Sequence, residues 1–364
     1  MRILHVSQPT EAGVALVVRQ LAADQVQRGH EVVVACPADG RLAGEVREVG
    51  ARHEEWGAGR APGIAVVRET ARLNRIVQAV EPDLVHLQSS KAGLAGRLAL
   101  RGRLPTLFEP HAWSFFVGGA VGAAALRWER FADRWADVVV CVCEGEREAG
   151  ERAGIRGRYA VIPNAVDLDA FTPATDDDRH AARSRLGLPA GPLVVCVGRL
   201  SRQKGQDILL RAWPAIAGAI PDAQLVLVGD GPERESLAAK AGAGVELVGH
   251  RDDVPDWLAA ADVVTLPSRW DVMAQTMLQA MARGRSVVST DVPGAREALS
   301  DGAGAIVPIE DERALAAALV ERLRDPAFAA AEGEVGRRVA VERHDFRRVG
   351  EQTAALYAEV LARS

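Results

Sequence analysis

The stretch "LVVCVGRLSRQKGQDILL", residues 193 to 210, carries the pattern that decides the fold. It opens with a short apolar run that does not alternate with polar residues, which is typical of a strand buried on both faces of a parallel sheet. A basic turn closed by Gly205 follows, and then comes a segment of helical length. A buried strand joined through a turn to a helix is the repeating unit of an α/β protein.

The same unit recurs on both sides of this stretch. The first half contains the runs "RILHVS", "EVVVAC", "DLVHLQ", "PTLFEP", "DVVVCVC" and "YAVIP". The second half contains "PLVVCVG", "AQLVLVG", "VELVG", "DVVTLP", "SVVST" and "GAIVP". Two series of buried strands predict two doubly wound parallel-sheet domains, and 364 residues are enough for each to bury its own core.

The boundaries follow from the segments that lack such runs. Residues 166 to 190 are rich in Asp, Pro and Ala, so we expect a linker there, with a short solvated helix capped by Asp176 or Asp177. This places one domain at residues 1–168 and the other at residues 169–345. The pattern is helical from Glu310 onward. We expect the last helix, residues 346–364, to cross back onto the first domain.

Composition limits the classes of partner. The 44 basic and 49 acidic residues give a net charge of -5, which argues against nucleic acid as a partner. The cysteines lie inside apolar runs, where thiols behave as small hydrophobic side chains, and no metal-ligand spacing is present, so we expect no metal site. The run "MRILHVS" lacks the length of a signal-peptide core, and "FFVGGAVGAAAL", residues 115 to 126, is too short to span a bilayer. We therefore expect a cytoplasmic protein. The cysteines are Cys36, Cys141, Cys143 and Cys196.

Ligands of open parallel sheets bind beyond the carboxyl ends of the strands, so the loops that follow the strands are where a site is expected. The turn "GRLSRQKG" holds Arg199 and Lys204, a compact pair of cations suited to a diphosphate. A solvated basic loop is the alternative interpretation of this turn.

The segment "PSRWDVMAQTMLQAMARG", residues 267 to 284, places Asp271 in a loop before a helix that ends at Gly284. We expect this helix to begin near Val272, and the amides at its start would favour an anion. Helical spacing puts Gln275, Thr276 and Gln279 on one polar face. An ordinary surface face is the alternative. The residues expected to face the core are Met277, Leu278 and Met281.

Two loops of the first half are further candidates. In "SQPTEAGVA", Gly13 opens a helix and lets a phosphate or sugar approach the backbone. In "FEPHAWSF", His111 lies just past a strand, at the edge where a site is expected, although a lone histidine is often structural.

The run of motifs resembles a known family. "GRLSRQKG", "LVLVGDGPE", "VELVGHRDDVPDWLAAADVVTLPSRWD" and "LQAMARGRSVVSTDVPGARE" resemble the retaining GT-B glycosyltransferases of family 4. "MRILHVSQPTEAGVA", "LVHLQSSKAG", "PHAWSF" and "VIPNAVDLDAF" extend the resemblance through the first half. It implies two Rossmann-like domains that face a central cleft, with a UDP- or GDP-linked sugar donor held mainly by the second domain and the acceptor by the first.

The resemblance also implies the chemistry. No cofactor or metal is expected, because Arg199 and Lys204 would neutralise the diphosphate. These two cations, His111 and Asp271 are the expected catalytic residues. The donor is expected to contact Gly13, Gly198, Arg199, Lys204, Gly249, Arg251, Asp271, Met273, Ala274, Thr276 and Gln279.

The chain departs from the family pattern at four positions. Family members usually carry Glu-x7-Glu, the first for the donor sugar and the second for the ribose, where this chain has Asp271 and Gln279. Replacing a charged acceptor by an amide weakens the ribose contact by roughly 1 to 2 kcal/mol. Ala12 and Ala165 stand where glycines are usual.

The function expected from the resemblance is transfer of a sugar, with retention of configuration, to a glycan, lipid-linked or small-molecule acceptor. A degenerate homologue that binds nucleotide or a partner without turnover, and an epimerase or phosphorylase of the same fold, are the alternatives. Contact with the inner face of a membrane is a further expectation, because "KAGLAGRLALRGRLP" reads as a basic amphipathic segment. A solvated helix face is the alternative there. The cations of this segment are Lys91, Arg97, Arg101 and Arg103.

Overall fold

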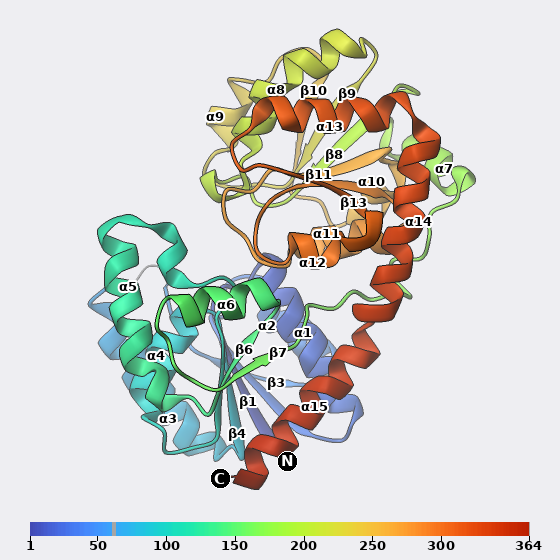
Figure 1. The fold of residues 1–364 in the computed structure, drawn as a ribbon. Coiled ribbons are helices and arrows are strands. Elements are labelled where there is room, and N and C mark those ends of the chain that lie inside the picture. The colour runs from blue at the N-terminus through green and yellow to red at the C-terminus, as the bar shows by residue number, and fades with distance from the viewer. Residues whose placement is uncertain (60–62, 364) are drawn as a thin grey trace. The chain divides into compact units, whose positions relative to one another are not determined.

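The computed structural model describes residues 1–59 and 63–363, which form two compact units (Figure 1). The first unit comprises Met1–Asn164 together with the residues from Phe346 onward, and the second comprises Ala165–Asp345. The chain thus enters the second unit just before the expected boundary at residue 168. The last residue of the expected C-terminal segment, residue 364, lies outside the described residues.

The first unit contains a seven-stranded parallel sheet with the order β3-β2-β1-β4-β5-β6-β7. The strand order reverses direction between β1 and β4, as it does in a doubly wound sheet. Its strands are β1 (Arg2–Ser7), β2 (Glu31–Cys36), β3 (Arg52–Glu55), β4 (Leu84–Gln88), β5 (Thr106–Glu109), β6 (Val138–Cys141) and β7 (Tyr159–Val161). Its α-helices are α1 (Ala12–Gln27), α2 (Leu42–Glu48), α3 (Ala65–Val80), α4 (Ser90–Leu100), α5 (Gly119–Ala132), α6 (Glu144–Arg152) and α15 (Phe346–Arg363).

The second unit repeats this plan with a six-stranded parallel sheet of order β10-β9-β8-β11-β12-β13. Its strands are β8 (Leu193–Val197), β9 (Gln224–Val228), β10 (Val245–Gly249), β11 (Val263–Leu266), β12 (Ser286–Thr290) and β13 (Gly304–Val307). Its α-helices are α7 (Asp176–Leu186), α8 (Gln206–Ala219), α9 (Arg234–Ala238), α10 (Val254–Ala260), α11 (Gln275–Ala282), α12 (Ala295–Ala298), α13 (Glu312–Arg324) and α14 (Pro326–Arg343). The prediction of two doubly wound α/β domains is confirmed.

The two faces of the first sheet are covered by different helices because successive residues of a strand point to opposite sides. On one face, Ile3, Leu84 and Leu107 pack with Leu356 and Tyr357 of α15. On the other face, the neighbouring strand residues pack against α3 and α4. The C-terminal helix α15 thus lies beside α1 in the core of the first unit (Figure 1).

The segment between the two sheets differs from its prediction. Helix α7 is capped by Thr175, whose side chain accepts from the backbone of Asp178 while the Asp178 carboxylate accepts from the backbone of Thr175. The cap is therefore not Asp176 or Asp177, because both lie inside the first turn. Arg179 and Arg183 bind Asp262 at 2.6 and 2.7 Å, so α7 is attached to the second unit by ion pairs.

The basic segment around α4 does not present the surface expected of it. Lys91 binds Glu69 at 2.7 Å and Arg97 binds Glu129 at 2.6 Å, and all four side chains are buried. Arg101 and Arg103 are exposed and donate to backbone carbonyls at the end of α4. Because only two of the four cations reach the surface, the predicted basic face is wrong. No helix among the described residues has the length and apolar character needed to cross a membrane.

Candidate functional site

Two loops at the carboxyl edge of the second sheet approach each other closely. One follows β8 and the other follows β11, neighbouring strands at the point where the strand order reverses. Gly205 ends the first loop with φ +68°, and a Cβ at this position would lie 1.9 Å from the carbonyl oxygen of Pro267 in the second. Only glycine lets the two backbones come this near.

Arg269 ties the two loops together. Its guanidinium makes paired hydrogen bonds of 2.7 and 2.8 Å to Asp207, at the start of α8. Its backbone nitrogen donates to the carbonyl of Gln203 at 2.8 Å, and the Gln203 amide donates to the carbonyl of Trp270 at 3.1 Å. Hydrogen bonds from Arg269 are the largest cause that lowers the pKa of Asp207, to about 2. The loops therefore form one structural element.

This element places the predicted acid against one of the predicted cations. The ammonium of Lys204 lies 2.5 Å from Oδ2 of Asp271. Asp271 is only 8% exposed. Arg199 is partly buried in the same loop, with Nη2 3.4 Å from Oε1 of Gln203. Lys204 is thus neutralised by Asp271 in this structure, which the sequence did not predict.

Helix α11 departs from its prediction at both its start and its polar face. It begins at Gln275 instead of near Val272, and Gly284, with φ +71°, follows its end. Gln275 is buried, and neither of its side-chain polar atoms has a hydrogen-bond partner. Thr276 and Gln279 are partly exposed, so the accessible polar face consists of these two residues without Gln275. The predicted core residues Met277, Leu278 and Met281 are buried.

The remaining predicted donor contacts of the second unit lie at the carboxyl ends of its strands or in the loops that follow them. Gly198 directly follows β8, and Gly249, with φ +76°, ends β10. Arg251 is exposed and paired with Asp253. Met273 and Ala274 directly precede α11.

The predicted residues of the first unit lie at the carboxyl edge of its own sheet. Gly13 is in the first turn of α1, directly after Ala12. Ala12 has φ +63°, a left-handed conformation that glycine adopts without strain. This explains physically why glycine is usual at position 12 in the proteins that the sequence resembles.

His111 sits in a strained turn held by a buried acid. His111 and the following Ala112 have φ values of 51° and 83°. The carboxylate of Glu146 accepts from the backbone nitrogens of Ala112 at 2.7 Å and Val142 at 2.9 Å. Glu146 is completely buried, and desolvation raises its pKa from 4.5 to about 7.

The His111 ring contacts two side chains that the sequence reasoning missed. Its Nε2 lies 2.6 Å from Oε1 of Gln88 and 3.6 Å from Oε1 of Glu109. These residues end β4 and β5 and are paired in the sheet register. Their position at the ends of apolar runs was the available signal, while Glu146 gave none because it lies on α6, distant in sequence.

Among residues 1–59 and 63–363, no group of three or more His, Cys, Asp or Glu side chains is arranged to hold a metal ion. The four cysteines, all within the described residues, are buried and form no disulfide bond.

Two family models match the chain. "Glycosyltransferase Family 4" matches residues 12–170, and "Glycosyl transferases group 1" matches residues 191–325. Each model falls almost wholly within one of the two units.

Two curated relatives extend this result. The α-maltose-1-phosphate synthase of Mycolicibacterium smegmatis is 30% identical over 335 residues, which cover 83% of this chain and 86% of that enzyme. The GDP-mannose-dependent monoacylated α-(1-6)-phosphatidylinositol monomannoside mannosyltransferase of Corynebacterium glutamicum is 36% identical over 50% of this chain. That match spans 52% of the mannosyltransferase, about half of its length.

The fold is that of solved GT-B proteins. Anabaena HepE in complex with UDP-glucose superposes with a TM-score of 0.86, at 24% identity, over 99% of this chain and 100% of HepE.

Proposed function

The chain belongs to glycosyltransferase family 4, and on that premise we propose that it transfers a sugar from a nucleoside diphosphate donor to an acceptor hydroxyl with retention of anomeric configuration. The observation that carries the proposal is the pair of joined loops in the second unit, which hold Arg199 and Lys204 at the carboxyl edge of the sheet. A nucleotide commonly binds at this edge of a doubly wound sheet.

The proposed donor is a UDP- or GDP-linked sugar. A relative is named as GDP-mannose-dependent, and a solved protein of the same fold holds UDP-glucose. Both nucleotides share the diphosphate, and this is the part of the donor for which the two cations are suited.

Arg199 and Lys204 would stabilise the negative charge that develops on the diphosphate as it leaves. Electrostatic stabilisation of this kind is usually the largest single contribution to such a step. The backbone amides at the start of α11 would add to it. Because Asp271 already binds Lys204 at 2.5 Å, the diphosphate would share this lysine with the carboxylate or displace it.

Retention follows if the acceptor attacks from the face that the diphosphate leaves. The bond from the anomeric carbon to the phosphate oxygen breaks, the bond to the acceptor oxygen forms on the same face, and the acceptor proton passes to the departing phosphate. His111 would orient a hydroxyl of the donor sugar or of the acceptor. The proposed acceptors are a glycan, a lipid-linked sugar or a small molecule, in the cytoplasm.

The experiment combines activity with product analysis. We expect Arg199→Ala and Lys204→Ala each to lower kcat by a factor of about 100 or more, as removal of one charge-stabilising group does in other enzymes. Lys240→Ala, which removes an exposed lysine of the second unit, is the matched control and should be neutral. Circular dichroism confirms folding, and the anomeric configuration of the product is read by NMR.

Three results would contradict the proposal. Near-normal turnover in both variants would reject the roles of the cations. An inverted product would reject retention. Binding of UDP or GDP in calorimetry, without transfer from any donor in a broad panel, would favour a nucleotide-binding homologue without turnover.

A further inference from the structure

A row of polar side chains crosses the interior of the first unit. His5 of β1, His86 and Gln88 of β4, and Glu109 of β5 are each at most 4% exposed. The sheet register pairs His5 with His86 and Gln88 with Glu109. Alternation along each strand therefore puts all four on one face of the sheet, the face that α15 covers.

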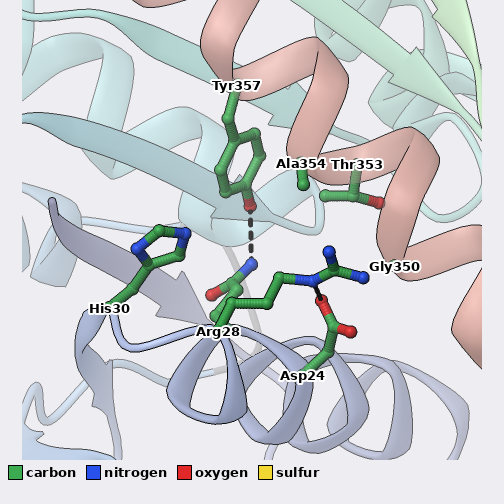
Figure 2. Close-up of a pocket in the computed structure, with 8 residues that line it drawn as sticks. Asp24, Arg28, His30, Gly350, Thr353, Ala354 and Tyr357 are labelled. Atoms are coloured by element: carbon green, nitrogen blue, oxygen red, sulfur yellow. Dashed lines mark hydrogen bonds and ion pairs between the residues drawn. The ribbon is translucent and has the colours of Figure 1, made fainter.

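Tyr357 joins this row from α15. Figure 2 shows its ring pointing toward α1, where the Gln25 amide donates to the phenol oxygen at 3.2 Å. The same oxygen lies 2.7 Å from Nδ1 of His86. Burial raises the pKa of Tyr357, so the phenol keeps its proton. The phenol oxygen accepts a hydrogen bond from the Gln25 amide. The phenol O–H then donates a hydrogen bond to Nδ1 of His86.

This bond settles the protonation of His86. Because Nδ1 accepts a hydrogen bond, the neutral ring carries its proton on Nε2. That nitrogen lies 3.1 Å from Oε2 of Glu109, and although the two atoms do not form a hydrogen bond, the negative oxygen favours a proton on Nε2. Desolvation lowers the pKa of His86 to about 3, so the ring is neutral near pH 7.

The orientation of the Gln88 amide follows next. Its Nε2 lies 3.2 Å from Nδ1 of His86, and its side chain hydrogen-bonds to the Glu109 carboxylate. Nδ1 of His86 is an acceptor, so the end of Gln88 that faces it must be the NH2 group. Burial raises the pKa of Glu109, and a hydrogen bond donated by this NH2 group acts against that rise by favouring the ionised carboxylate. The other end, Oε1, then faces Nε2 of His111 at 2.6 Å. A carbonyl oxygen at that distance requires a donor.

We propose that Gln88, oriented by Glu109 and by the Tyr357–His86 pair, is a positioning residue that holds neutral His111 as the Nε2–H tautomer. The ring then presents Nδ1 as a hydrogen-bond acceptor. The opposite tautomer would set a nitrogen lone pair against the Gln88 carbonyl. The strained turn at His111 and Ala112, held by Glu146, fixes the backbone from which the ring projects.

The consequence for transfer rests on the proposed function. A ring that accepts through Nδ1 selects a sugar hydroxyl that donates its proton, and it can take that proton only at Nδ1. The tautomer itself depends on the first unit alone, so it can be measured whether or not transfer occurs.

The experiment measures the tautomer directly. The full chain is labelled with 15N at histidine, and long-range proton–nitrogen correlation spectra near pH 7.5 distinguish Nε2–H from Nδ1–H rings. The His111 signals are assigned by their loss in His111→Asn. We expect the unliganded wild type to show His111 as Nε2–H. A wild-type ring protonated at Nδ1 would overturn the proposal without any further variant.

Gln88→Met tests the cause, because methionine keeps the length of the side chain but makes no comparable hydrogen bond. We expect a mixture of His111 tautomers and a fall in kcat of about 10- to 100-fold, with a smaller change in KM for the donor. Gln78→Met, at an exposed site on α3, is the matched control. An unchanged His111 tautomer in folded Gln88→Met would reject the assignment.

Tyr357→Phe is the milder variant if Gln88→Met does not fold. We expect a partial shift in the His86 and His111 signals and a loss of a few-fold in kcat. The chain has only two tyrosines, so Tyr159→Phe, which removes a hydroxyl bonded to the carbonyl of Ile155, is the natural control. Identical His111 spectra in Tyr357→Phe and wild type would show that Tyr357 of α15 does not help to fix the His111 tautomer. If the tautomers behave as expected while no donor supports transfer, the proposed function fails and the positioning role stands.

Discussion

The side chain at position 271 shows how an acid can pair with a cation of the same site. Similar enzymes usually carry glutamate there, whereas Asp271 ends against Lys204 at 2.5 Å and is nearly buried. The acid therefore lowers the charge available to a diphosphate before any donor arrives. Gln279 at the second position adds no charge. With one acid instead of two, the site is less negative than a Glu–Glu pair would make it. One of its two cations, Lys204, is nevertheless already paired with Asp271.

Replacing this acid tests the competition for Lys204. In Asp271→Asn the ammonium loses its partner, so we expect UDP or GDP to bind about 5- to 10-fold more tightly, as expected for a charged hydrogen bond that becomes available. Transfer should fall, because the carboxylate proposed to contact the donor sugar is gone. Calorimetry and kcat measure the two effects, with Asp222→Asn, at an exposed site, as the control. Weaker nucleotide binding would show that Asp271 does not compete with the diphosphate.

Glu146 should give a characteristic pH dependence of stability. Burial raises its pKa from 4.5 to about 7 in the folded protein, so folding favours the protonated acid. The stabilisation is fully present below pH 4.5 and is lost as pH rises through 7, to a limit of about 3 kcal/mol. His5 and His86 have pKa values lowered to about 3, so their contribution instead grows as pH rises toward 6.5.

The measurement must therefore compare variants. The free energy of urea unfolding of the wild type minus that of Glu146→Gln is expected to fall between pH 5 and pH 8, because both histidine contributions cancel in the difference. Glu148→Gln, at an exposed site of the same helix, should show no such slope. A difference that stays constant over this range would mean that Glu146 is already ionised in the folded protein at pH 5.

At the scale of elements, the joined loops after β8 and β11 depend on one glycine. Gly205→Ala places a methyl 1.9 Å from the carbonyl of Pro267 and forces φ +68° on alanine. We expect a loss of roughly 2 to 4 kcal/mol in unfolding free energy and at least a 100-fold loss of transfer, because Lys204 moves with the loop. Gly218→Ala, inside the helix α8 that follows Gly205 and with open space around it, should gain up to about 1 kcal/mol. Equal denaturation midpoints for Gly205→Ala and wild type would contradict the loop contact.

Elements with apolar runs could be predicted from sequence, and others could not. Twelve expected runs correspond to strands because parallel strands buried on both faces are apolar throughout. The strand missed, β3, reads "RHEE" and lies at the edge of the sheet, where burial is slight. The sequence places the start of α11 too early because residues 272–274 are apolar and read as helix, whereas the chain bends there and brings Asp271 onto Lys204.

The candidate site divides in the same way. Arg199 and Lys204 share the short loop after β8, and Asp271 lies in the loop after β11. Each loop directly follows an apolar strand, so local sequence is enough to find all three residues. Gln88, Glu109 and Glu146 act on His111 from three separate elements. Their role depends on packing between residues distant in sequence. The sequence places Gln275 on a polar face with Thr276 and Gln279, but the structure buries it, because periodicity cannot tell how deeply a helix start is buried.

At the scale of the whole molecule, the C-terminal helix completes the core of the first unit. Leu356, Tyr357 and Val360 of α15 are at most 7% exposed and pack on the sheet. Removing residues 346–364 should destabilise the first unit by roughly 5 to 9 kcal/mol, from the loss of three buried side chains. The second unit should keep its own transition in urea, followed by circular dichroism. Two unchanged transitions would show that α15 is dispensable.

Because α15 follows the second unit in sequence but belongs to the first, the order of synthesis limits when the first unit can complete its core. Residues 1–164 are made before the second unit, but their core lacks α15 until residues 346–363 have been synthesised. The second unit, translated later, has all of its own segments before the first unit does. Domains normally fold in the order of synthesis. Here the first unit is completed only after the second has been made, and until α15 emerges, apolar strand residues such as Ile3 and Leu84 lack its cover.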